Sequence, residues 1–268
     1  MINRIALGVA YHGGSFHGWQ RQKGIRTVQG TLEEALSRIA NHQVETRAAG
    51  RTDSGVHAMG QVVHFDTMAE RSDKAWTEGV NSWLSNDVAV RWVARPGPDF
   101  DARFSAQSRT YRYLLFVDHV VNPFFESAAL REHRPLNTEL MNESAQHLVG
   151  EHDFSSFRAA HCQSKSPMRR VTSISVEEHQ GFIQIEITAN AYLYHMVRNI
   201  VGALRLVGAC QRPPEWLGHL LLAKDRHQAG RMAPAHGLYL EQVAYDPSYQ
   251  LPAVTRLTGS QPPFIRPA

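Results

Sequence analysis

The sequence predicts an α+β protein with mostly antiparallel sheets flanked by helices. Through residues 1–105, strand-type alternation and helix-type spacing follow the order strand, helix, strand, strand, helix, strand. This is the order of a ferredoxin-like unit. Residues 106–268 mix strands and helices in a similar order, without a sequence repeat. We therefore expect two α/β lobes, 1–105 and 106–268, and the apolar share of 43% can fill a core.

The first lobe begins with a buried strand over residues 5–11. The loop at residues 12–22 combines glycine, aromatic rings, amides and arginine, a mixture suited to contact with nucleic acid. An ordinary surface loop anchored by Trp19 is the alternative. Apolar residues at helical spacing predict an amphipathic helix over residues 28–42. The other expected elements are strands at 43–47 and 61–65, a helix from Ser72 to about Leu84 and a strand at 88–93.

The second lobe begins with a strand at 109–117, on which Tyr111 and Tyr113 share one face. Packing in the core is the commoner fate of such tyrosines, so packing and binding are both open. A long helix is expected just after His195, with Arg198 near its N-terminal end, where an anionic group is favoured. The other expected elements are a helix at 138–149 capped by Asn137, a hairpin of strands at 170–177 and 182–189, a helix at 213–224, a strand at 235–243 and an irregular tail from Pro247.

The composition narrows the function classes. The net charge is +3 with a sequence pI near 9.0, and lysine occurs only at positions 23, 74, 165 and 224, so most cations are arginine. Arginine forks onto phosphate and stacks on bases, although GC-rich coding would also favour it. Cys162 and Cys210 form no paired motif, which argues against a disulfide framework or zinc ribbon and fits a reducing cytosol. The sequence contains no signal-peptide pattern and no apolar run of membrane-spanning length.

The loop around Asp53 is the strongest candidate for a functional site. It lies between two expected strands, is rich in glycine and alanine, and carries Arg51 two residues before Asp53. Small residues let a backbone approach a ligand closely, and loops on a rigid scaffold often carry chemistry. A surface turn in which Asp53 caps its own backbone is the competing interpretation. On this pattern alone the two interpretations are about equal.

Several chemistries lack their motifs. His57 and His64 are seven residues apart without an acidic or cysteine partner at ligand spacing, and no serine-hydrolase elbow, Walker loop or dinucleotide fingerprint occurs. A lone aspartate kept ionised by nearby arginine could attack a sugar carbon. Glycosidases usually need a second acid, and none lies near Asp53 in the sequence. The residues alone thus indicate an RNA- or nucleoside-directed enzyme with Asp53 at its site.

Residues 50–58 (GRTDSGVHA) resemble the active-site signature of the tRNA pseudouridine synthase A family. Further matching segments follow in family order across nearly the whole chain. They are GWQRQ at 18–22, ARFSA at 102–106, YRY at 111–113, DFSSF at 153–157, HMVRN at 195–199 and GLYL at 237–240. The Arg-Thr-Asp-x-Gly-Val-His segment is the specific one, and the others gain weight together.

The resemblance implies a fold, a reaction and a set of residue roles. It implies a pseudouridine synthase fold of two ferredoxin-like lobes with the active-site cleft between them. Asp53 would be the nucleophile, Arg51 would orient it, and Arg198 would pair with it. Tyr111 would pack on the target uridine, and Leu238 would line the pocket. The expected substrates are uridines 38, 39 and 40 in the tRNA anticodon stem-loop, and the expected protein is a cytoplasmic homodimer that needs no metal or other cofactor.

The sequence departs from the family pattern at three positions. His12 stands where many members carry aspartate, Tyr194 where many carry a basic residue, and Ser54 where alanine is common. These departures concern RNA affinity and site preference rather than the reaction class. Two rival functions are a catalytically silent tRNA-binding module of the same fold, and a nucleoside hydrolase or glycosidase that would release free uracil.

Overall fold

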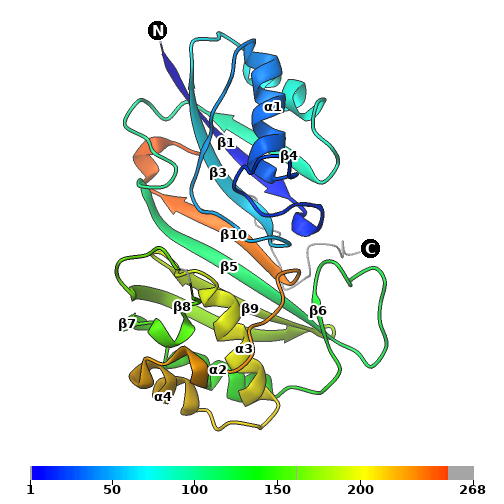
Figure 1. The fold of residues 1–268 in the computed structure, drawn as a ribbon, viewed down its shortest axis with the longest axis vertical. Helices are drawn as coiled ribbons and strands as arrows, with labels where there is room; N and C mark the ends of the chain where they lie inside the picture. The colour runs from blue at the N-terminus through cyan, green and yellow to red at the C-terminus, as the bar shows by residue number, and fades with distance from the viewer. Residues whose placement is uncertain (1, 161, 253–268) are drawn as a thin grey trace. The chain divides into compact units, whose positions relative to one another are not determined.

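The structure is a computed structural model that describes residues 2–160 and 162–252 (Figure 1). It divides into two compact units. Of the described residues, the first unit holds those up to Gln107 together with residues 239–252, and the second runs from Ser108 to Leu238. The lobes expected at 1–105 and 106–268 place the C-terminal strand differently, since that strand pairs within the first unit.

The sheet of the first unit is built around β3 (His57–Thr67). Strand β1 (Asn3–Tyr11) pairs antiparallel with β3 on one side and with β4 (Val88–Ala94) on the other. Because β1 occupies one edge of β3 along most of its length, the short strand β2 (Arg47–Ala48) and β10 (Leu238–Tyr245) share the opposite edge. β2 pairs antiparallel at His64 and β10 pairs parallel at His57, so both ends of that edge are used.

Strand β2 is shorter than the expected strand at 43–47, and the reason lies in α1 (Val28–Ala40). The backbone amide of Val44 donates to Ser37 Oγ at 2.9 Å, and that of Thr46 donates to the buried Glu33 carboxylate at 2.7 Å. These amides are therefore satisfied by helix side chains instead of a neighbouring strand. The sequence pattern alone could not distinguish the two partners.

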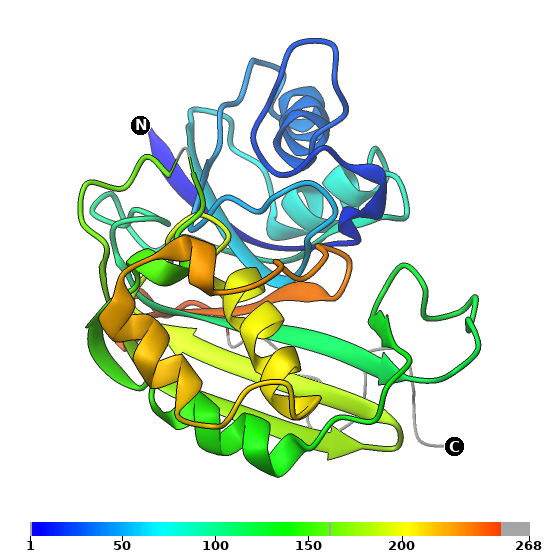
Figure 2. The same ribbon diagram turned by 60° about the horizontal axis from the view of Figure 1, so that its bottom comes forward.

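Two helical segments cover the sheet of the first unit (Figures 1 and 2). Thr27 caps α1 by accepting from the amide of Gly30, and the helix ends at Asn41 in the left-handed conformation. The segment expected as a helix at 72–84 contains a five-residue π-helix, Ala75–Gly79. Apolar spacing cannot separate the α and π hydrogen-bond registers in so short a segment. Trp76 of this helix is fully buried, with its ring 5.2 Å from that of Phe65 on β3.

The strands of the second unit follow the order β6-β5-β9-β8-β7. Its strands are β5 (Ala106–Val117), β6 (Leu130–Glu132), β7 (Gly150–Asp153), β8 (Met168–His179) and β9 (Phe182–Ala189). All neighbours pair antiparallel except β5 and β6. The expected hairpin forms between β8 and β9, where Gln180 and Gly181 both adopt positive φ, as a tight hairpin turn requires.

Three helices of the second unit lie on one face of its sheet (Figures 1 and 2). They are α2 (Thr138–Gln146), α3 (Met196–Gly208) and α4 (Trp216–Ala223). Asn137 caps α2 as expected, through a 2.9 Å bond from the amide of Leu140. The ends of α2 and α4 lie a few residues inside the expected bounds, where turns replace the helix. Short 3-10 segments occur at Gly13–Ser15, Ser155–Phe157, Arg226–Gln228 and Pro247–Tyr249.

The mixed α/β architecture and the mostly antiparallel pairing agree with the expected fold class. Among the residues that the structure describes, no helix is both long and apolar enough to cross a membrane. Most of the irregular tail expected from Pro247 lies outside the described residues, which end at 252.

Candidate active site

The Asp53 loop, residues 49–56, connects β2 to β3 and is fixed at its start by the strand that follows it. The amide of Ala49 donates to Val62 O at 2.8 Å, and Gln61 Nε2 donates to Gly50 O at 2.7 Å. Further along, the amide of Val56 donates to Asp53 O at 3.1 Å. The start of the loop and its turn at Asp53 are therefore fixed by individual hydrogen bonds, although the described loop residues form no regular strand or helix.

The loop at residues 12–19 packs directly on the Asp53 loop. Gly18 has a φ of +83°, and a Cβ atom there would lie 2.8 Å from Thr52 O, closer than such atoms normally approach. Next to it, the amide of Trp19 donates to Thr52 O at 3.0 Å. The Trp19 side chain is only 2% exposed. It therefore anchors this loop in the core, and contact of the loop with nucleic acid stays a prediction for its exposed residues.

Thr52 lies between Arg51 and Asp53, the two residues expected to take part in the reaction, and its side chain is buried. Its hydroxyl lies 2.8 Å from the hydroxyl of Tyr11, which is also 3.5 Å from Gln61 Nε2. Burial raises the pKa of Tyr11 to about 12, against the smaller opposing effects of these hydrogen bonds, so the phenol keeps its proton. With Thr52 turned inward, Arg51 is exposed and Asp53 is half-buried. A rigid neighbour thus fixes the backbone that carries the carboxylate.

His57, directly after the loop, has a structural position that the sequence did not reveal. Its side chain is buried, and Nδ1 accepts a hydrogen bond from the amide of Gly13 at 3.0 Å. The ring stacks on Tyr239 at a centroid distance of 4.6 Å and lies 4.4 Å from the ring of His12. The residue that departs from the family pattern, His12, therefore packs against the end of the signature segment.

In the second unit, Tyr111 and Tyr113 on β5 have different surroundings although they share a face. Tyr113 is fully buried, and its hydroxyl donates to Pro234 O at 2.9 Å. Tyr111 is half-buried, with its ring edge-on to Tyr192 at 4.9 Å. The hydroxyl of Tyr192 is held by the carbonyl oxygens of Arg109 and Ile187 at 3.0 and 2.7 Å. Tyr113 is thus a core residue, whereas Tyr111 keeps accessible ring surface.

Arg198 occupies the first turn of α3, as the sequence predicted for a residue near the helix start. Its Nε donates to Ala233 O at 2.9 Å, and the amide of Ala233 donates to Arg198 O at 3.0 Å. A Cβ atom at Gly202 would lie 2.1 Å from Arg231 O, so this glycine is what lets the segment 231–233 approach the helix. The guanidinium is thereby oriented by backbone on a second element.

The remaining expected residues take positions at the edges of these elements. Leu238, the first residue of β10, is buried, and its amide donates to Ala235 O at 2.9 Å. Tyr194, the second departure from the family pattern, is 45% exposed and stacks on His195 at 3.7 Å. A partly exposed pair of stacked rings therefore stands where the family pattern has a basic residue.

The structure groups the expected site residues by unit. Arg51 and Asp53 belong to one loop of the first unit, and Tyr111, Arg198 and Leu238 belong to the second. The supporting roles of Tyr11, Gln61, His57 and Tyr192 were not predicted from the sequence, because each rests on contacts with segments distant in the chain. Within the described ranges, no cluster of three or more histidine, cysteine or acidic residues is placed to hold a metal ion.

Comparison with known proteins finds a family model and sequence relatives that agree on one family. The chain matches the model of the tRNA pseudouridine synthase family over residues 8–105 and 144–246. It is 50% identical over 249 residues to tRNA pseudouridine synthase A of Tolumonas auensis, covering 93% of this chain and 95% of that protein. It is 51% identical over 252 residues to the Vibrio campbellii protein of the same name, covering 94% and 95%.

Among solved structures, an H/ACA RNP bound to a substrate RNA containing 2'-deoxyuridine aligns with a TM-score of 0.33 at 14% identity. That alignment covers 75% of this chain and 44% of the other, and it is too distant to support a conclusion. The sequence relatives carry the assignment. Since the family model matches most of the chain and relatives are half identical along nearly all of it, this chain belongs to the tRNA pseudouridine synthase family.

Proposed function

We propose that this protein converts uridine to pseudouridine at positions 38, 39 and 40 of the tRNA anticodon stem-loop, with Asp53 as the nucleophile. The supporting observation is the locked loop around Thr52. Its buried hydroxyl and its backbone carbonyl are both bonded, to Tyr11 and Trp19, while Asp53 next to it keeps access to solvent. Catalytic carboxylates need this kind of positional control by their neighbours.

The reaction is an isomerisation, so its atoms balance without a co-reactant. The N1–C1′ bond of the uridine breaks, the uracil turns, and C5 joins C1′; the proton on C5 is lost and N1 gains one. Asp53 would hold the sugar or the base covalently while the uracil turns. Attack of Asp53 at C1′ or at C6 is equally compatible with its role as nucleophile, whereas proton removal at C2′ would make Asp53 a base instead.

The other roles in the proposal follow from the type and setting of each residue. A stacked or paired uridine must leave the helix before it can react. Stacking on the accessible ring of Tyr111 would offset about 1–3 kcal/mol of that cost. Arg51 and Arg198 would orient the carboxylate and hold the extruded nucleotide, and Leu238 would line the pocket. The proposal includes a homodimer in the cytoplasm, as the family resemblance implies.

The direct test uses an unmodified tRNA transcript with uridines in the lower anticodon stem. Pseudouridine is mapped by carbodiimide labelling and primer extension after incubation with the wild type or with Asp53→Asn. Asp99→Asn is the matched control, because it makes the same chemical change at an exposed position of the same unit. New stops with the wild type and the control, and none with Asp53→Asn, are the expected result.

Three other outcomes separate the rival functions. Bound tRNA without new stops would favour the silent binding module, and released free uracil would favour a hydrolase. Stops that persist with Asp53→Asn would remove Asp53 from its role as nucleophile. Light scattering of the purified protein, alone and with tRNA, tests the dimer separately.

A further inference from the structure

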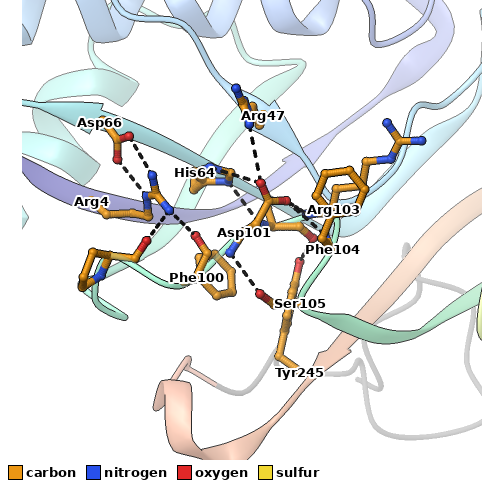
Figure 3. A network of polar contacts seen from close by, with 12 residues as sticks. Arg4, Arg47, His64, Asp66, Phe100, Asp101, Arg103, Phe104, Ser105 and Tyr245 are labelled. Atoms are coloured by element: carbon orange, nitrogen blue, oxygen red, sulfur yellow. Dashed lines mark hydrogen bonds and ion pairs between the residues drawn. The ribbon is translucent and has the colours of Figure 1, made fainter.

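A surface turn of the first unit exposes a large aromatic ring beside a cation. The turn, residues 101–105, joins the segment after β4 to the start of β5, and we call it the Phe104 turn. The Phe104 side chain is 77% exposed, and the guanidinium carbon of Arg103 lies 5.3 Å from its ring centroid. Figure 3 shows the two side chains lying together on the side of the turn away from Arg4 and Asp66. A singly exposed aromatic ring is ordinary on a protein surface, and the cation packed beside this ring is what makes it a candidate ligand contact.

The Phe104 turn is closed by its own first residue. Asp101 Oδ1 accepts from the amides of Arg103 and Phe104 at 2.8 and 3.0 Å, and the amide of Asp101 donates to Ser105 Oγ at 3.0 Å (Figure 3). The amide of Ser105 donates back to Asp101 O at 2.9 Å. Burial alone would raise the pKa of Asp101, but the two amides together with the charges of His64 and Arg47 outweigh burial and hold that pKa below its ordinary value. The backbone under Phe104 is therefore fixed without help from the ring.

The same turn is also tied to the sheet. The amide of Ala102 donates to Nδ1 of the buried His64 at 3.0 Å, and its carbonyl accepts from the hydroxyl of Tyr245 at 2.6 Å (Figure 3). Phe100, just before the turn, is fully buried, with its ring 5.1 Å from that of Tyr245. Hydrogen bonds to His64 on β3 and Tyr245 on β10 thus fix the backbone of the turn to the sheet. The exposed ring sits on rigid backbone, and rigid aromatic anchors lose little conformational entropy on binding.

The Phe104 turn is connected to the strands that carry the Asp53 loop. His64 lies on β3 opposite Arg47 of β2, and Arg47 is paired with Asp101 at 3.7 Å while its side chain is 74% exposed. From His57, at the end of the Asp53 loop, to His64 the strand advances seven residues, or about 23 Å at about 3.3 Å per residue. The other end of the loop is nearer, because Arg47 precedes Ala49, the first residue of the loop, by only two positions. One aromatic ring and two guanidinium groups therefore lie beside the strands that carry the Asp53 loop.

We propose that the Phe104 turn is a docking platform for the RNA substrate, on which an unpaired base stacks against Phe104. Every base has a π-face, and arginine beside an aromatic ring favours a polyanion over an apolar protein partner. The platform holds the RNA beside the strands that carry the Asp53 loop and takes no part in the chemistry. This inference rests on the proposed function, because it takes tRNA as the ligand.

The test compares Phe104→Leu with Phe104→Trp in the full-length protein. Leucine keeps an apolar side chain but cannot stack, whereas tryptophan stacks at least as well. We expect Phe104→Leu to bind an unmodified tRNA transcript about five- to 150-fold more weakly, the range for one base on one ring, and Phe104→Trp to bind like the wild type. Phe124→Leu is the matched control, since Phe124 is 87% exposed in the second unit.

Photocrosslinking supplies a readout that a purely structural role would not give. Benzoylphenylalanine in place of Phe104 should crosslink to the tRNA, and the same group in place of Phe124 should not. Equal affinity of Phe104→Leu and wild type, or no crosslink at Phe104, would overturn the platform. A change of oligomeric state in Phe104→Leu would instead make this turn an interface between copies of the chain, which also overturns it.

The proposed function fails by a different result. A wild type that binds tRNA through Phe104 but forms no pseudouridine would contradict the reaction and leave the platform standing. If the wild type forms pseudouridine and Phe104→Leu binds tRNA as tightly as the wild type, the platform is contradicted and the proposed reaction stands.

Discussion

The two units hold their candidate residues in different ways. In the first unit, Asp53 lies in a loop whose neighbour Thr52 forms neutral hydrogen bonds with Tyr11 and Trp19 and is closely approached by the backbone of Gly18. In the second unit, Tyr111 lies on a strand and Arg198 on a helix, so the backbone hydrogen bonds of the sheet and of the helix fix their positions. In this unit β6 and α3 are joined by a buried ion pair instead of neutral groups: the carboxylate of Glu132 on β6 accepts hydrogen bonds from Arg205 on α3.

The difference shows where the site is vulnerable. A loop without a ladder has the geometry that its neighbours impose, so a small change in a neighbour moves the carboxylate. A strand or helix keeps its geometry when one side-chain contact is lost. We therefore expect changes around the Asp53 loop to reduce activity more than stability, and changes in the second unit to reduce both in proportion. Four variants test this, from the largest expected effect to the smallest.

The largest effect on stability is expected at the charged cluster of the second unit. Glu132 is fully buried and accepts from Arg205 Nε at 2.9 Å and from Arg134 Nε at 3.2 Å. Glu132→Gln leaves these arginines without their countercharge, at a cost of about 3 kcal/mol, the low end for a broken buried pair because both arginines keep some solvent. Urea unfolding measures the loss, and Glu177→Gln, in an exposed pair with His179, is the control.

The same variant has a pH signature. Burial alone would raise the pKa of Glu132, but the hydrogen bonds and charges of Arg205 and Arg134 outweigh burial and lower it from 4.5. A depressed folded pKa stabilises the protein fully above the ordinary value, and this contribution is lost as pH falls through the folded pKa. The stability difference between wild type and Glu132→Gln should therefore be constant above about pH 5 and shrink below pH 4.5. A difference that grows on acidification would contradict the assignment.

The sharpest test of the Asp53 loop is Gly18→Ala. The left-handed conformation at Gly18 costs a residue with a side chain about 1–2 kcal/mol, and the contact with Thr52 O adds to it. We expect a loss of about 2–3 kcal/mol in stability and a fall in kcat larger than that loss explains. Gly24→Ala separates backbone strain from the contact with Thr52, because Gly24 has a φ of +74° but open space around its Cβ position. Equal activity loss in both variants would refute the packing argument.

Tyr11→Phe probes the hydrogen bond that fixes Thr52. It leaves the buried Thr52 hydroxyl without this partner, at about 1–2 kcal/mol. We expect kcat to fall while KM for tRNA changes little, since no RNA contact is removed. Tyr245→Phe is the matched control, because it removes a hydroxyl bonded to Ala102 O and leaves the contacts of Thr52 intact. A kcat loss of the same size in the control would show that the effect is general destabilisation.

The smallest effect is expected from Tyr192→Phe in the second unit. The ring that supports Tyr111 stays, and only the hydroxyl that binds Arg109 O and Ile187 O is lost. The cost should be about 0.5–1.5 kcal/mol, with kcat/KM falling no more than the stability loss predicts. Thermal unfolding and single-turnover kinetics give the two numbers. An activity loss as steep as in Tyr11→Phe would remove the contrast between the units.

The sequence by itself determined the features that depend on nearby residues. The cap of α2 at Asn137, the start of α1 at Val28 and the hairpin turn at Gln180-Gly181 all follow from side chains within a few positions. The signature around Asp53 indicated the family in the same way, because its residue types and spacing are local. Such features are predictable from the chain alone, since each depends on a short stretch of residues.

The tertiary structure decided which partner each local segment meets. It turned Trp19 and Tyr113 into core residues while Tyr111 kept accessible surface, and it shared one edge of β3 between β2 and β10. It also placed His64, from β3, beneath the turn that presents Phe104. None of these follows from periodicity, because burial and pairing depend on contacts between segments far apart in the chain, whose arrangement only the packed fold defines.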